Sequence, residues 1–118
     1  MSSRKWLLRV RDILRAISSI QKLTANLEFE EFITSETIVK SVLYDFIVIG
    51  EAARNIPTEV QKSYPQIPWI PMGDMRNVVT HEYFQVDLEI VWDSIQNDLE
   101  PLAIQLWSLL EHESNSDR

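Results

Sequence analysis

Apolar residues in the first quarter of the chain recur at spacings of three and four, the pattern of a helix with one buried stripe. This pattern predicts a first helix from about Arg4 to Leu27. The other side of the helix is polar and should face solvent. The stripe consists of Trp6, Leu7, Val10, Ile13, Leu14, Ile17, Ile20, Leu23 and Leu27.

A second helix is predicted from about Ser35 to Arg54, after a connecting stretch rich in glutamate. Thr34 or Ser35 can cap it by accepting a hydrogen bond from a free backbone amide of its first turn. Residues 42–49 are apolar nearly all round, which predicts burial against more than one neighbour. We therefore expect this helix at the centre of the fold.

Three polar or small residues stand in or beside that apolar run. A glycine in a helix costs about 1 kcal/mol relative to alanine, so Gly50 predicts a close helix crossing. Asp45 and Glu51 are expected to be exposed or paired with an arginine. A catalytic carboxylate pair is disfavoured, because nothing else in the chain marks a glycosidase or a metal site.

Prolines divide the middle of the chain. Pro57 can begin a short helix that runs to about Tyr64, and a rigid connector carrying Trp69 should follow. A further helix is expected to begin near Pro68 or Pro71. Its apolar positions Met72, Met75 and Val79 follow helical spacing, which turns another set of side chains toward the opposite, polar side: Arg76, Asn77, Thr80 and His81.

The last helix should begin with Asp87 as its N-cap, and Pro101 should kink or interrupt it. Together with the helices predicted above, this last helix gives an all-α, antiparallel bundle of four long helices and a short one. We expect a single domain over residues 1–113 and a frayed polar tail at 114–118, with His112 in solvent. The stripe consists of Leu88, Val91, Trp92, Ile95, Leu99, Leu102, Leu106 and Leu109.

Composition excludes several kinds of chemistry. The chain has no cysteine, so disulfides, thiol catalysis and cysteine-based zinc sites are excluded, and a reducing cytoplasm fits. No segment reaches the roughly 20 apolar residues of a membrane span, and the amphipathic N-terminus does not look like a signal peptide. No cofactor and no metal ion is expected, because paired-histidine motifs and glycine-rich phosphate loops are missing from the sequence.

The net charge of −7 argues against general affinity for nucleic acid, so a nucleic-acid substrate would need a local site. The charge is uneven: the first helix is basic and the chain after Asp87 is acidic. Two solvated faces are the plain interpretation of this pattern.

Residues 75–83, Met-Arg-Asn-Val-Val-Thr-His-Glu-Tyr, resemble the signature of HEPN proteins, and Tyr83 two residues after His81 resembles the Arg-x4-His-x-Tyr form of the HepT-like toxins. Three more blocks resemble that subgroup: residues 49–54, 67–69 and 86–88. The resemblance implies a metal-independent ribonuclease toxin that acts as a homodimer on RNA. It also implies a minimal nucleotidyltransferase as antitoxin, which attaches AMP to Tyr83.

The chemistry of the two motif residues agrees with that implication. Cleavage of RNA without a metal needs proton transfer from the 2′-hydroxyl and to the leaving 5′-oxygen, and histidine suits both near neutral pH. It also needs positive charge on the phosphate, which a planar arginine supplies through two hydrogen bonds. Arg76 and His81 are therefore the candidate catalytic residues; the alternative is a surface pair with no substrate.

Helix geometry adds a constraint on this site. Five residues turn an ideal helix by about 500°, so Arg76 and His81 point about 140° apart, whereas Asn77 nearly aligns with His81. Two copies meeting at a two-fold axis would place two arginines and two imidazoles around one cleft. Asn77 is a candidate supporting residue that orients His81 or binds phosphate, or else is simply exposed. Tyr83 could equally stack on a base.

The alternative function for the whole chain is that of a non-catalytic helical dimer, an adaptor or nucleotide-binding module.

Overall fold

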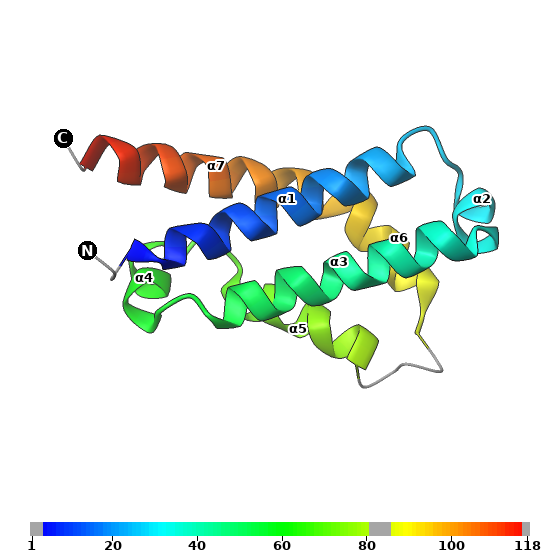
Figure 1. Ribbon diagram of the computed structural model, residues 1–118, viewed down its shortest axis with the longest axis horizontal. Helices are drawn as coiled ribbons and strands as arrows, with labels where there is room; N and C mark the ends of the chain where they lie inside the picture. Colours follow the sequence, from blue (N-terminus) through cyan, green and yellow to red (C-terminus); the bar gives the residue numbers. More distant parts are fainter. Residues whose placement is uncertain (1–3, 81–85, 117–118) are drawn as a thin grey trace.

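The computed structural model describes residues 4–80 and 86–116, and over these ranges the chain forms helices and no strand (Figure 1). The predicted all-α class is confirmed. None of the helices in these ranges is long and apolar enough to cross a membrane. The helices are α1 (Trp6–Thr24), α2 (Phe29–Thr34), α3 (Glu36–Arg54), α4 (Thr58–Ser63), α5 (Trp69–Thr80), α6 (Leu88–Asn97) and α7 (Leu99–Ser116).

Helix α3 lies at the centre, with α1 packed along one side and α5 along the other (Figure 1). Helix α7 packs beside α1, and α6 leads into it. The expectation that the apolar middle of α3 meets more than one neighbour is therefore confirmed. Large side chains with less than 2% exposure fill the core between these helices, among them Ile13, Ile17, Phe32, Phe46, Ile49, Met72, Leu99 and Leu106.

The predicted close crossing at Gly50 is present. A Cβ atom on Gly50 would lie 2.5 Å from the Cβ of Arg76 and 2.7 Å from its backbone nitrogen. Real Cβ atoms do not approach other atoms so closely, so only glycine lets α3 and α5 meet at this distance. The crossing thus determines where Arg76 stands relative to α3.

Short-range capping explains where several helices begin. The Ser35 hydroxyl accepts from the backbone amide of Ile38 at 3.4 Å, and an Asp87 oxygen accepts from the amide of Glu89 at 2.9 Å, so both predicted N-caps are confirmed. The stretch expected to be a simple connector contains α2. Glu28 begins that helix with a capping box, in which the Glu31 carboxylate accepts from the Glu28 amide at 2.8 Å.

The predicted last helix is divided into α6 and α7, so the expectation of four long helices needs correction on this point. Pro101 does interrupt the helix, but the break falls at Asp98. Proline lacks the amide that would bond to the carbonyl four residues earlier, and its ring clashes with that carbonyl. The carbonyl belongs to Asn97, the last residue of α6. Pro101 itself fits in the first turn of α7, where no such bond is needed.

Helix α7 continues to Ser116, beyond the point where the polar tail was expected to fray. Contacts that no hydrophobic pattern reveals hold this end. The Tyr64 hydroxyl hydrogen-bonds to the Glu113 carboxylate and lies 2.8 Å from Nδ1 of His112, while Arg4 pairs with Glu113 at 3.2 Å. Burial, together with the Glu113 carboxylate, raises the pKa of Tyr64 to about 12. The hydroxyl therefore keeps its proton and stays a donor.

Gly50→Ala is expected to destabilise the protein, and to do so more than Gly73→Ala. Both changes gain about 1 kcal/mol of helix propensity. At Gly50 the new Cβ would meet the backbone of Arg76, and such overpacking costs about 1–3 kcal/mol. At Gly73 it would meet only the Arg54 side chain, at 3.2 Å. Urea unfolding of the two variants measures the difference; equal midpoints would contradict the role of the crossing.

Candidate functional site at the crossing of α3 and α5

Helix α5 begins directly after Pro68 and carries two of the four predicted site residues, Arg76 and Asn77. His81 and Tyr83 lie outside the described residues. The apolar positions of α5 lie as predicted, with Met72 and Val79 buried and Met75 partly buried.

Arg76 does not stand on a free polar face, as its helical position suggested. Its backbone and Cβ pack against Gly50 of α3, and its side chain is 33% exposed. The Nε atom forms an ion pair with the carboxylate of Glu51. The expectation that Glu51 is exposed or paired with an arginine is therefore confirmed. Arg76 and Asn77 of α5 therefore face the C-terminal half of α3, where Glu51 pairs with Arg76 and Arg54 donates to Asn77.

A second arginine, Arg54, links the same two helices. Its Nε donates to the carbonyl oxygen of Gly73 at 3.2 Å, and its Nη2 donates to Oδ1 of Asn77 at 3.1 Å. Asn77 also reaches Asp74 through its amide nitrogen, at 3.5 Å. Asn77 is thus held by Arg54, and its action on His81 or on a phosphate stays a prediction.

The arrangement suits the binding of an anion. The pairing with Glu51 uses Nε of Arg76, and no other described residue pairs with its two terminal nitrogens. These nitrogens form the edge that binds phosphate with two parallel hydrogen bonds. Because Gly50 and Glu51 hold the arginine from two sides, little conformational freedom is lost when an anion binds. Within the described residues, this crossing brings two guanidinium groups onto one side of α5.

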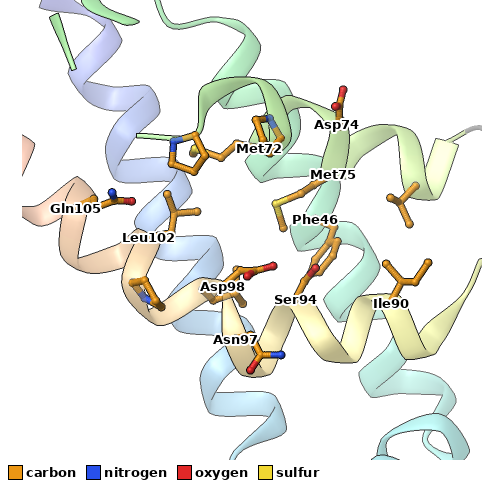
Figure 2. Close-up of a pocket in the computed structure, with 15 residues that line it drawn as sticks. Phe46, Met72, Asp74, Met75, Ile90, Ser94, Asn97, Asp98, Leu102 and Gln105 are labelled. Atoms are coloured by element: carbon orange, nitrogen blue, oxygen red, sulfur yellow. The ribbon is translucent and has the colours of Figure 1, made fainter. Parts of the chain in front are cut away.

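The other side of α5 borders an apolar groove that fits such chemistry poorly (Figure 2). The groove encloses about 430 Å³ between α5 and the junction of α6 with α7, and Phe46 and Met75 contribute to its lining. Its charged lining residues are Asp74 and Asp98, and no described Lys, Arg or His side chain lines it. Two carboxylates would repel a phosphate, so the Arg76 side is the better candidate.

Asp45 does not join Glu51 in a carboxylate pair. It hydrogen-bonds to Ser19 of α1, while Glu51 faces Arg76 of α5, so the two acids have different neighbours. Burial raises the pKa of Asp45 above its usual range, and the Ser19 hydrogen bond opposes part of that shift. Over residues 4–80 and 86–116, no group of three or more His, Asp or Glu side chains is placed to hold a metal ion.

The role of Arg54 was missed at the level of sequence, although residues 49–54 were noted as a block. The sequence did contain a signal that Arg54 meets the neighbouring helix. Arg54 follows Gly50 by four residues, one helical turn, so a close crossing at Gly50 turns Arg54 toward the same neighbouring helix. The pairing of Glu51 with Arg76 required knowledge of which helix crosses there.

The all-α bundle is consistent with a HEPN-like helical protein. More narrowly, the family model described as ribonuclease HepT-like matches residues 13–109, and the chain belongs to this family.

Curated relatives support the assignment. The chain is 34% identical over 93 residues to "Probable ribonuclease HepT" of Thermococcus cleftensis, covering 79% of this chain and 84% of the relative. It is 32% identical over 106 residues to "Putative RNase MJ1216" of Methanocaldococcus jannaschii, covering 90% and 88% of the two chains. No solved structure gives a significant match.

Arg54→Leu is expected to loosen the second half of α5 without unfolding the bundle. The change removes both hydrogen bonds from Arg54 to α5, each worth about 1 kcal/mol net when partly exposed. Amide hydrogen exchange at residues 76–79 should therefore become about tenfold faster. Lys62→Leu on α4 removes an exposed positive charge elsewhere and serves as the control. Unchanged protection in the Arg54 variant would show that these bonds do not hold α5.

Proposed function

We propose that this protein is a metal-independent endoribonuclease, the toxin of a toxin and antitoxin pair, with Arg76 and His81 as catalytic residues. The observation that carries the proposal is the anchored guanidinium of Arg76, whose Nε is held by Glu51 while its terminal nitrogens are left for a phosphate. Membership in the HepT-like ribonuclease family supports RNA as the substrate. A site in the cytoplasm agrees with the absence of cysteine.

The proposed reaction is a transesterification within the RNA backbone. An imidazole removes the proton from a 2′-hydroxyl, whose oxygen attacks the adjacent phosphorus. The bond to the 5′-oxygen breaks, and a second imidazole protonates that leaving oxygen. The products are a cyclic phosphate and a 5′-hydroxyl. Arg76 stabilises the negative charge that builds on the phosphate in the transition state.

Two imidazoles require two copies of the chain, because each copy contributes one His81. We propose a homodimer in which α5 of one copy faces α5 of its mate. In that arrangement one His81 acts as base and the other as acid, with both Arg76 side chains beside the same phosphate. Asn77 supports the site from the preceding turn. Because Arg76 is held in place beside α3, each copy would contribute an arginine in a fixed position to the shared site.

The proposed antitoxin is a minimal nucleotidyltransferase that attaches AMP to Tyr83. Tyr83 lies two residues after His81 in the sequence, so AMP on its hydroxyl would bring a phosphate and a nucleotide body close to the catalytic pair. That phosphate could occupy the terminal nitrogens of Arg76 in place of the substrate. Charge repulsion and obstruction would then both exclude RNA.

Arg76→Ala and His81→Ala are each expected to lower RNA cleavage by about 100-fold or more while the helical content stays unchanged. Loss of a general acid or base costs about 10²–10⁴ in rate, and loss of a donor to the transition state about 10²–10³. Alanine at 76 keeps the Cβ that packs on Gly50. Cleavage of labelled RNA, assayed with and without a chelator, measures the effect, and the chelator should not reduce it.

His112→Ala, which removes the other histidine of the chain, and Lys62→Ala are matched controls that should keep full activity. Mixing the unaltered chain with an excess of the His81→Ala protein tests the composite site, because a mixed dimer has a single His81 and lacks either the base or the acid. The cleavage rate per unaltered chain is expected to fall as mixed dimers form. Full activity of either single variant would refute the mechanism, and a fully active monomer in light scattering would refute the composite site.

Tyr83→Phe is expected to keep cleavage but to escape silencing by the antitoxin. Without the hydroxyl there is no acceptor for AMP. Co-expression with the proposed nucleotidyltransferase antitoxin, followed by intact-mass and peptide mass spectrometry, should show AMP on Tyr83 of the unaltered chain and none on the variant. Tyr44→Phe removes an exposed hydroxyl on α3 and should remain modifiable. AMP on another residue with Tyr83 unmodified would remove Tyr83 from the control mechanism.

A further inference from the structure

Positive charge is concentrated in α1 and the residues just before it, in an otherwise acidic chain. Residues 1–27 contain six of the eleven Lys and Arg residues but only one of the eighteen Asp and Glu residues. The rest of the chain has five basic and seventeen acidic residues. A polyanion approaching this protein would therefore be attracted chiefly to α1, on the other side of α3 from α5 (Figure 1).

Three of these residues form what we call the basic ridge: Arg11, Arg15 and Lys22, all exposed on α1. Their spacings of four and seven residues place them along one side of the helix, about 6 Å and about 10 Å apart in rise. Arg15 shares Asp12 with Arg9 and remains 78% exposed in its side chain. Among the described residues, no carboxylate pairs with Arg11 or Lys22.

Exposed aromatic rings stand on both sides of the ridge. Trp107 of α7, 59% exposed, lines an open groove of about 620 Å³ together with all three ridge residues. Tyr44 of α3, 66% exposed, lines a neighbouring hollow with Arg15, but Asp12 and Asp45 line that hollow too, so Trp107 is the better platform beside a phosphate. Ser18 and Ser19 of α1 also line the first groove, and Ser19 hydrogen-bonds to Asp45.

We propose that the basic ridge and its two flanking rings bind a single-stranded segment of RNA. Phosphates would lie along the ridge, bases would stack chiefly on Trp107, and the Ser18 hydroxyl would donate to the backbone. Positive side chains that follow a backbone beside aromatic platforms are the combination that single-stranded nucleic acid requires. The choice of RNA as the polyanion rests on the proposed function, but the surface is separate from the Arg76 site.

The surface suits RNA better than a membrane. A helix that lies on a lipid surface places a continuous apolar face in the lipid and its charges at the borders. Here the charges lie in the middle and isolated rings lie at the sides, which matches a charged strand with planar bases. A second copy of this chain is a weaker match, because the ridge would meet an identical ridge across a two-fold axis.

The test measures fluorescence anisotropy of a labelled 15-nucleotide oligouridine with the full chain carrying His81→Ala, which leaves the RNA uncut. Added to that background, the triple change Arg11→Gln, Arg15→Gln and Lys22→Gln should weaken binding at least tenfold. It should also reduce the slope of log affinity against log salt by about 2, at about 0.7 per lost phosphate contact on a single strand. Lys62→Gln should leave both quantities nearly unchanged.

A separate pair of variants at Trp107 tests how much base stacking contributes to RNA binding. Trp107→Ala should weaken binding about tenfold, because stacking on one ring is lost, whereas Trp107→Phe should retain most of the affinity. Tyr44→Ala should have a smaller effect in the same direction, because Asp12 and Asp45 line the hollow beside that ring. None of the three changes should alter the salt slope, since no charge is removed.

Two results would overturn the proposal. One is unchanged oligouridine affinity in the triple variant. The other is conversion of a dimer to a monomer by the triple change in light scattering, which would make the ridge an interface between copies.

Cleavage of a dinucleotide too short to span both surfaces separates this proposal from the proposed function. The triple variant in an otherwise unaltered chain should cleave it normally. If the unaltered chain cuts no RNA but binds oligouridine through the ridge, the ribonuclease proposal fails and the ridge stands.

Discussion

The close contact between Gly50 and Arg76 is the constraint on which the rest of the structure depends. Two helices can approach this closely only where one of them lacks a side chain, so a single glycine determines the separation and register of α3 and α5. With that register in place, Glu51 meets Nε of Arg76, and Arg54 one turn later meets Gly73 and Asn77. The site is a product of helix packing rather than of a loop.

An acidic protein that handles a polyanion has to confine its attraction to small areas. Here the positive groups near α5 are held by hydrogen bonds and ion pairs across the helix crossing, which gives them fixed directions. The basic ridge is different, because its side chains extend into solvent and act mainly through charge. Fixed donors favour the stabilisation of one geometry, whereas mobile charges tolerate many sequences and shapes of a strand.

Much of the fold was predictable because it follows from local rules. The periodic stripes located the long helices, and the side-chain chemistry of Ser35 and Asp87 located two of their starts. An interruption of the last helix by Pro101 was predictable. Its position at Asp98 follows because the ring of Pro101 clashes with the carbonyl of Asn97, four residues earlier. The partners of Arg76 and Arg54, and the hold of Tyr64 on Glu113, join residues far apart in the chain. Periodicity within one helix carries no information about such pairs, and for that reason Arg76 was expected on a free face.

The packing of α7 against α1 also bears on the order in which the molecule is completed (Figure 1). The apolar stripe of α1 leaves the ribosome before α7, one of the two helices that cover it, has been synthesised. At about 5–20 residues per second, several seconds separate the two events. During that time the nascent chain holds an uncovered hydrophobic strip that a chaperone can recognise. A chain released early, without α7, would keep that strip exposed and would be a natural substrate for proteolysis.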